Sequence, residues 1–383
     1  MNQVKLIKNI RPYYSTDNSV TDVLIAGEKI TAVNKDIDTG NIPAEVIDAQ
    51  GALATPGLID MHIHTIGGGG QTGFFSLAPE VKVSSLITCG TTTVVGLLGT
   101  DSFVKELPQL YAKTMALRQN GLSAYMLTGA YSLPSPTLTG SVVNDLIFID
   151  PVIGCKVAIS DDRSSFPTEL ELLRIIHDVR LGGFTSGKGG VMHIHLGGLD
   201  SGLSILIDIA RKYPTLIGYI SPTHTIRTEK LFNQAIEFAQ MGGMIDISTG
   251  GTKYTEPYKA VLHALEKGVK IEAMTFSSDG NAGVRRIDPE KGIDTYRLAP
   301  LNLNLEQTLK LITDGGLSPA DAFKLITENP ARTMKLRSKG YLQPGYDADL
   351  CLFDDTYTLR TVISRGEVFV SDGKIVKYGN FEQ

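Results

Sequence analysis

The chain has 383 residues, of which 42% are hydrophobic and 20% are charged, a balance that is typical of a folded globular protein. Its 36 lysines and arginines and 41 acidic residues give a formal net charge of -5, and the sequence has no basic stripe of the kind that a nucleic-acid-binding protein needs. No apolar run approaches the roughly 18 residues of a membrane span, so we expect neither nucleic acid nor a membrane as a partner.

The N-terminal segment, residues 1–56, consists of short strand-like pieces separated by glycine and polar turns: QVKLIKNIRPYY, SVTDVLIAGEKITAVNKDI and AEVIDAQGALATPG. Lys5 and Lys8 interrupt its apolar positions, so it lacks the continuous apolar core of a signal peptide. The three cysteines of the chain lie far apart in apolar surroundings and form no CxxC motif. We therefore expect a cytoplasmic protein with reduced cysteines.

The middle of the chain alternates β-branched runs with helical patterns, which predicts βαβ units and a parallel sheet. Helical segments such as KELPQLYAKTMALRQNG and PTELELLRIIHDVRLGG end at glycine, a residue that suits a left-handed C-cap. Eight strands are predicted, at residues 57–64, 91–98, 123–131, 154–160, 190–196, 216–224, 244–248 and 271–279. Eight strand-helix repeats over residues 57–335 predict an α/β fold of the TIM (β/α)8 barrel type.

The C-terminal segment returns to short strands. The last helical pattern, SPADAFKLITENPARTM, begins with Ser318 as a candidate N-cap and meets Pro330 near its end. The strand-like stretch DADLCLFDDTYTLRTVISRGEVFVSDGKIVKYG follows it. We therefore predict two domains: a small β-sandwich that residues 1–56 and 336–383 build together, and the barrel of residues 57–335.

Two histidines stand at the end of the first barrel strand. Because strand side chains alternate, His62 and His64 should share one face. Ile59, Met61 and Ile63 should then face the outer helices. This arrangement places both imidazoles inside the barrel at the carboxyl end of the strand, where barrel enzymes carry their catalytic residues.

Other strands end in similar residue types. In the fourth strand, alternation places Ile153, Cys155, Val157 and Ile159 on one face and Lys156 on the inner one. A lysine inside a barrel is costly unless it has a partner or a function. The remaining candidates at strand ends are His193, His195, His224 and Asp279.

Imidazole and carboxylate groups together suit zinc or a similar first-row metal. The set exceeds what one tetrahedral ion needs, so two metals about 3.5 to 4 Å apart fit it better. The fourth strand offers no Asp or Glu as the anionic bridge between them. The alternatives are that these histidines are hydrogen-bonded core residues and that Lys156 is a buried salt-bridge partner. His193 lies deeper and is expected to support a ligand rather than to be one.

TPGLIDMHIH, the inward Lys156, SSDGN and GYLQPGYDADLCLF resemble the amidohydrolase superfamily. Within it, GGGG, VVGLLGTDS, MLTGAY, TGSV and AISDDRS resemble the isoaspartyl (β-aspartyl) dipeptidase family, and the match covers nearly the whole chain. The resemblance implies hydrolysis of the β-aspartyl peptide bond of small acidic dipeptides by a hydroxide that bridges two metals. It also implies a homo-oligomer, and specifically an octamer.

The resemblance further implies that carbon dioxide carbamylates Lys156 and so creates the bridging ligand. Of two zinc ions or similar divalent metals, one would be held by His62, His64, Lys156 and Asp279, and the other by Lys156, His195 and His224. Asp279 fits the base that takes a proton from the hydroxide and returns it to the leaving amine. Tyr131 resembles the family tyrosine that hydrogen-bonds the developing oxyanion, although an ordinary aromatic residue at the barrel rim is the alternative.

Substrate recognition is expected from Arg163 and Arg227, which follow ligand-bearing strands. Arginine binds carboxylates with two parallel hydrogen bonds, so the pair suits an acidic peptide, whereas solvated loop arginines are the alternative. As the family suggests, Gly69 within the glycine run 67–70 could form a backbone nest for a carboxylate, and Thr100 could donate to it. A flexible loop is the alternative for the glycines.

Gln71 departs from the family pattern, which has glutamate there to bind the free α-amine of the isoaspartyl residue. Glutamine keeps the shape and an acceptor oxygen but loses the charge. The departure implies a different or neutral substrate end, or a change made to slow turnover. Gly283, where the resemblance predicts serine, is a second departure.

Two other functions remain open at this point. A cyclic-amide hydrolase resembling dihydroorotase or hydantoinase would share the barrel and the metals. A non-catalytic scaffold of the same fold would be expected to have lost ligands, and here the full set is present.

Overall fold

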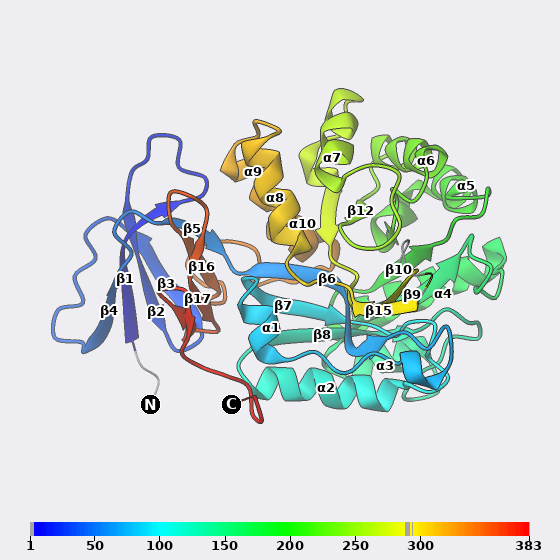
Figure 1. Ribbon diagram of the computed structural model, residues 1–383, viewed down its shortest axis with the longest axis horizontal. Coiled ribbons are helices and arrows are strands. Elements are labelled where there is room, and N and C mark those ends of the chain that lie inside the picture. Colours follow the sequence, from blue (N-terminus) through cyan, green and yellow to red (C-terminus); the bar gives the residue numbers. More distant parts are fainter. Residues whose placement is uncertain (1–3, 288–291, 293, 383) are drawn as a thin grey trace.

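The computed structural model describes residues 4–287, 292 and 294–382. Strands from both ends of the chain form one sheet, which lies beside the barrel (Figure 1). Its N-terminal strands are β1 (Val4–Pro12), β2 (Thr21–Ala26), β3 (Lys29–Asn34), β4 (Ala44–Asp48) and β5 (Leu53–Pro56). Its C-terminal strands are β16 (Leu350–Phe353), β17 (Leu359–Ser364), β18 (Glu367–Ser371) and β19 (Lys374–Ile375). β5 joins the two sets, because it pairs with β1 on one side and with β16 on the other.

The eight predicted barrel strands are confirmed. β6 (Leu58–Gly68), β7 (Thr91–Gly96), β8 (Ser123–Gly129), β9 (Val152–Ile159), β10 (Val191–Leu196) and β11 (Ile220–Thr223) pair in parallel in this order. β12 (Ile245–Ser248) and β13 (Met274–Ser277) form a parallel pair that closes the curve between β11 and β6. Two strands begin later than predicted, because 3-10 turns, η2 (Pro214–Tyr219) and η3 (Ile271–Ala273), precede β11 and β13.

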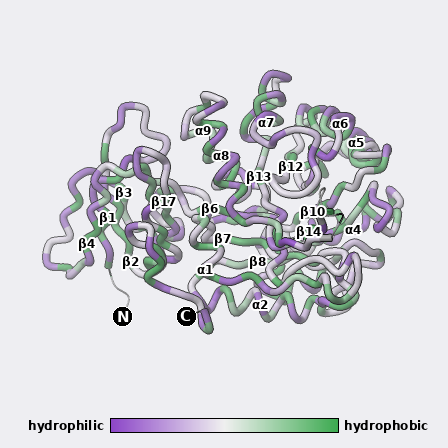
Figure 2. The backbone as a smooth tube through the Cα atoms, viewed as in Figure 1, coloured by the Kyte–Doolittle hydropathy of each residue, from purple (hydrophilic) through white to green (hydrophobic). Residues whose placement is uncertain are grey.

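The outer helices cover the barrel and show alternating hydrophobic and hydrophilic stretches in Figure 2. They are α1 (Val83–Ile87), α2 (Leu107–Gln119), α3 (Val142–Phe148), α4 (Glu169–Ser186), α5 (Ser204–Lys212), α6 (Glu229–Gln240), α7 (Pro257–Glu266) and α8 (Leu303–Thr313). Ser318 caps the next helix as predicted, but the expected single helix is two, α9 (Pro319–Lys324) and α10 (Glu328–Thr333), because Thr327 between them is not helical. None of the helices that the structure describes has the length and apolar content needed to cross a membrane.

The predicted alternation is wrong at the start of β6. Ile59 and Met61 pack in a cluster with residues of the next four strands and of the last helix, α10, and not in the core that lies beneath the other helices. Ile63 belongs to the core beneath those helices, as predicted. The pairing of β6 with β7 shifts register between Asp60 and Ile63, and such an irregularity changes which face the following side chains occupy. Ile153, at the start of β9, is inside for the same reason.

A hairpin that the sequence did not predict lies over the glycine run. β14 (Gly280–Ile287) and β15 (Asp294–Leu298) are antiparallel, and β14 also pairs with the end of β6. Thr72 donates a hydrogen bond to the hydroxyl of Tyr296 at 3.0 Å, and the Tyr296 ring meets that of Phe75 edge to face. The hairpin therefore fixes the loop that follows β6, which includes the short helix η1 (Phe74–Ser76).

A buried lysine ties the barrel to the terminal sheet. Lys339 Nζ lies 2.5 Å from Asp349 Oδ2 and 2.8 Å from Asp347 Oδ2, and it donates to Ser123 at the start of β8. Lys339→Met is expected to lower the free energy of unfolding by about 3–5 kcal/mol, because it leaves buried carboxylates without a partner. Urea unfolding measures this loss.

Lys29→Met is the matched control. Lys29 pairs with the same Asp347, but its side chain is 48% exposed, so its removal should cost no more than about 1 kcal/mol. Equal losses in the two variants would contradict the structural role of Lys339.

Candidate metal centre

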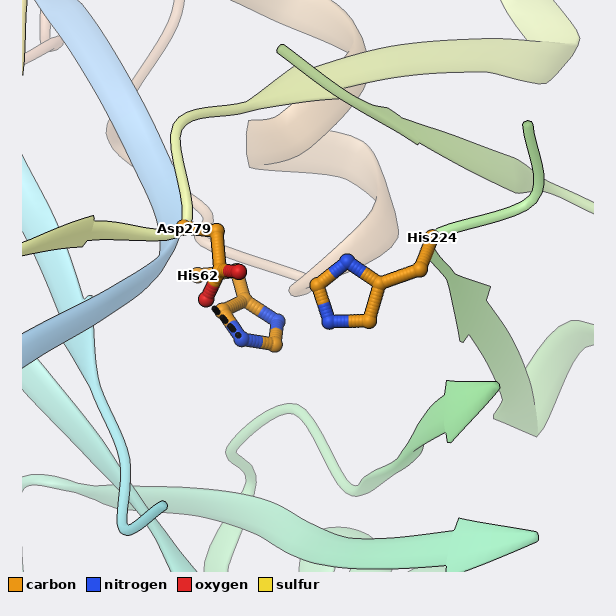
Figure 3. Close-up of side chains that lie close together, drawn as sticks. All are labelled: His62, His224 and Asp279. Atoms are coloured by element: carbon orange, nitrogen blue, oxygen red, sulfur yellow. Dashed lines mark ion pairs between the residues drawn. The ribbon is translucent and has the colours of Figure 1, made fainter. Parts of the chain in front are cut away.

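Three side chains at the carboxyl ends of barrel strands lie close enough to hold one cation. His62 in β6, His224 after β11 and Asp279 after β13 each offer a ligand atom, and these atoms lie within 4.8 Å of one another (Figure 3). His62 Nε2 is 3.4 Å from Asp279 Oδ1, and both histidines are buried. His224 and Asp279 have left-handed backbones, with φ of 62° and 51°. Such backbone conformations cluster at functional sites.

Two further predicted ligands adjoin this cluster. His64 Nε2 lies 3.2 Å from Asp279 Oδ1, and Lys156 Nζ lies 3.3 Å from His62 Nε2. Lys156 is fully buried, and burial lowers its pKa to about 7, so a large fraction of this amine is neutral near pH 7. Burial would raise the pKa of Asp279, but His224 and the hydrogen bonds from His62 and His64 hold it well below its usual range. Asp279 is therefore a carboxylate.

His195 stands at the same barrel end but has other partners. Its ring centroid is 4.6 Å from that of His224, yet its Nε2 is 2.9 Å from Asp161 Oδ2, and its Nδ1 is 2.7 Å from the Tyr131 hydroxyl. Asp161 was not among the predicted site residues. The sequence marks it only as a carboxylate just after the fourth strand, a position from which its side chain reaches His195.

The buried imidazoles are neutral and are oriented by polar neighbours. Burial lowers the pKa values of His62 and His195 to about 3, and the neutral form is the one that binds metal. His193 lies behind His62, with its Nε2 2.8 Å from His62 Nδ1. Ser248 Oγ is 2.6 Å from His224 Nδ1. Partners of this kind fix the ring orientation of metal-ligating histidines, so the donor set fits a metal.

Within the described part of the chain, a buried nitrogen of His64 lacks a hydrogen bond. Nδ1 of His64 is buried without a hydrogen bond, and so are both carboxylate oxygens of Asp101. Gly99 lies between the two side chains, and a Cβ there would stand 3.0 Å from His64 Cε1 and 3.1 Å from Asp101 Oδ1. The close approach of the His64 and Asp101 side chains to the backbone at residue 99 therefore depends on glycine.

A cleft of about 300 Å³ opens over the cluster, and all the predicted substrate residues line it: Gly69, Gln71, Thr100, Arg163 and Arg227. Asp161 accepts two hydrogen bonds from the Arg163 guanidinium, and Arg227 donates to the backbone oxygen of Leu196. Gly283, also in the lining, has its backbone next to the glycine run, because a Cβ there would lie 2.9 Å from Gly68 O. Arg285, which the sequence reasoning missed, lines the cleft from the unpredicted β14.

The sequence and the fold of this chain are similar to those of known proteins. Two sequence profiles of the Amidohydrolase family match residues 189–377 and 45–95. The beta-aspartyl dipeptidase of Fervidobacterium islandicum AW-1, solved in complex with the beta-Asp-Leu dipeptide, is 39% identical with a TM-score of 0.90, and the match covers 99% of this chain and 100% of that one. N-isopropylammelide isopropylaminohydrolase of Burkholderia multivorans shares the fold, at 16% identity and a TM-score of 0.65 over 98% of this chain and 100% of that one.

More distant relatives have other activities. The adenine deaminase of Thermosipho melanesiensis is 24% identical over 97% of this chain, which spans 59% of the length of that protein. The dihydroorotase of Pelotomaculum thermopropionicum is 24% identical over 87% of this chain and 84% of its own length.

Proposed function

Because the chain belongs to the amidohydrolase family and is a homologue of beta-aspartyl dipeptidase, we propose that it hydrolyses the β-aspartyl (isoaspartyl) peptide bond of small acidic dipeptides. The observation that carries this proposal is the cluster of His62, His224 and Asp279 beneath a cleft with arginines in its walls. That the homologue was solved with beta-Asp-Leu supports the substrate class.

We propose that Lys156 forms a carbamate: its neutral amine attacks carbon dioxide, a C–N bond forms and one proton is released. The buried amine beside His62 supports this step. The ligands of two zinc ions or similar divalent metals would be His62, His64, carbamylated Lys156, His195, His224 and Asp279. A bound metal pair lowers the pKa of water and polarises a carbonyl oxygen.

The residues around the cleft supply the remaining chemistry of the proposed reaction. The Asp279 carboxylate accepts the proton of the attacking water and returns it to the leaving amine. Burial raises the pKa of Tyr131, so its hydroxyl keeps its proton and can donate to the developing oxyanion. Arg163 and Arg227 hold the carboxylates of the substrate, and Gly69 and Thr100, which line the same cleft, donate further hydrogen bonds to them.

An activity panel tests this function. On protein whose metal content is measured in the same sample, we expect release of leucine from β-Asp-Leu, no release from α-linked Asp-Leu, and no turnover of a cyclic amide such as dihydroorotate. Turnover of the cyclic amide alone would instead indicate a cyclic-amide hydrolase. A metal-free, inactive protein would indicate a scaffold.

The organisation of the chain is proposed along with its function. We propose that residues 1–56 and 336–383 form one domain and residues 57–335 the other. We also propose that the chain assembles into a homo-oligomer, as the family resemblance implies, which the mass of the assembly in solution would measure.

A further inference from the structure

We infer that Asp101 is a positioning residue of the metal centre: its carboxylate accepts the Nδ1 proton of His64 and so keeps the lone pair of Nε2 directed at the metal cluster. The inference rests on the proposed function, because it takes His64 as a metal ligand. Three observations carry it: the orientation of the His64 ring, the unused acceptor atoms of Asp101, and the place where the two side chains meet.

His64 points at the cluster in the same way as His62. Nε2 of each ring lies near Asp279 Oδ1, at 3.4 Å for His62 and at 3.2 Å for His64. Nδ1 of His62 lies 2.8 Å from His193 Nε2, whereas Nδ1 of His64 is buried without a hydrogen-bond partner among the described residues. A metal-ligating histidine almost always donates its second ring N–H to an acceptor. The His64 ring therefore needs an acceptor near Nδ1.

Asp101 has the acceptor atoms that this ring needs. Its side chain is 2% exposed, and neither of its oxygens makes a hydrogen bond within the described part of the chain. Lys105 Nζ lies 4.0 Å from Asp101 Oδ2, too far for a hydrogen bond, and donates instead to the backbone oxygens of Ile66 and Ala78. Lys105 thus balances the charge of Asp101 but leaves its acceptor sites unused.

The two side chains meet beside the backbone of Gly99. A Cβ at residue 99 would stand 3.3 Å from His64 Nδ1 and 3.1 Å from Asp101 Oδ1, so both atoms lie around one point. Burial raises the pKa of Asp101, and among the charges that oppose this shift His64 has the largest effect, ahead of Lys105. Rotation of the Asp101 side chain, or one bridging water, joins the two atoms.

The location of Asp101 suits a supporting role. His64 lines the cleft over the cluster, whereas Asp101 lines the neighbouring cavity and is not among the described residues that line the cleft. A proton held on Nδ1 leaves the lone pair on Nε2, the ring atom that faces Asp279. A carboxylate acceptor also makes the imidazole more basic, and therefore a stronger metal ligand.

Metal affinity tests the inference, measured by competition with a chelator. Asp101→Ala is expected to weaken the binding of one metal by about 10–100-fold, the usual effect of removing such a partner. Asp101→Leu, which fills the volume without an acceptor, should show the same loss and replaces Asp101→Ala if that variant does not fold. Native affinity in these variants would overturn the inference and leave the proposed function intact. A native protein that binds no metal would overturn the proposed function.

A double-mutant cycle tests whether Asp101 acts through His64. In a His64→Ala background, Asp101→Ala should change the affinity for the remaining metal by no more than about 2-fold, because the ring that Asp101 orients is gone. The same 10–100-fold loss in both backgrounds would overturn the inference, since Asp101 would then act independently of His64.

Asp145→Ala is the matched control. Asp145 is also buried, but its carboxylate accepts hydrogen bonds from the backbone N–H groups of Leu138 and Thr139 and from the Thr128 hydroxyl. Its removal should lower the thermal stability of the metal-free protein more than Asp101→Ala does and should leave metal affinity unchanged. An equal loss of metal affinity in the two variants would overturn the inference, because any buried carboxylate would then have this effect.

Discussion

Asp279→Asn is expected to lower kcat by about 10²–10⁴-fold, the usual contribution of general acid-base catalysis, while the protein keeps its metals. Asparagine preserves the shape of the side chain and an oxygen that can ligate. It cannot accept a proton, however, whereas the native Asp279, whose pKa is held well below its usual range by His224, His62 and His64, is an ionised carboxylate that can. Steady-state kinetics and metal analysis on the same preparation measure the two quantities.

Asp208→Asn on the exposed side of α5 provides the control and should leave both quantities unchanged. A near-normal kcat in Asp279→Asn would refute the role in proton transfer. If activity falls only in proportion to the metal content, Asp279 acts as a metal ligand and not as the base.

Lys156→Met is expected to lower kcat/KM by at least about 10³-fold, which corresponds to the several kcal/mol that a metal contributes to transition-state stabilisation. Methionine cannot form a carbamate, so the metal content should fall below two per chain. The fold should remain, because an unbranched apolar side chain fills the volume of a buried lysine without its desolvation cost. Metal analysis and thermal unfolding of the metal-free proteins measure these effects.

Lys188→Met is the control. Lys188 donates to the backbone oxygen of Ile149, which precedes β9 and so lies away from the metal cluster. Its replacement should change neither activity nor metal content. Two metals and full turnover in Lys156→Met would contradict the proposed bridging role.

The sequence predicted the barrel strands because each is a short β-branched run between helical patterns, several of which end at glycine. The prediction of which side chains face the barrel interior failed where strand pairing is irregular. It assumes an unbroken register, but the pairing of β6 with β7 shifts between Asp60 and Ile63. It also missed the hairpin of β14 and β15, since GNAGVRRIDPEKGIDTYRL is rich in glycine and charge and has no clear period of two.

The candidate ligands could be predicted because the carboxyl ends of parallel strands meet at one rim. The hydrogen-bond partners of these ligands could not be predicted. Asp161 and Ser248 bind His195 and His224, but polar residues in loops or at strand ends carry no periodic signal, and their contacts depend on the tertiary structure. A cavity of about 600 Å³ beside Gln71 was missed for the same reason, since Phe74 and Val104, which line it, meet only after folding.

The order in which the chain is synthesised matters for this architecture. β5 leads directly into β6, which bears His62 and His64, yet its partner β16 emerges from the ribosome only near the end of translation. Until then, a nascent chain presents an open strand edge, the kind of surface that promotes aggregation. A chain that ended before residue 350 would lack β16 and would leave this edge of β5, the strand that leads into His62 and His64, unpaired.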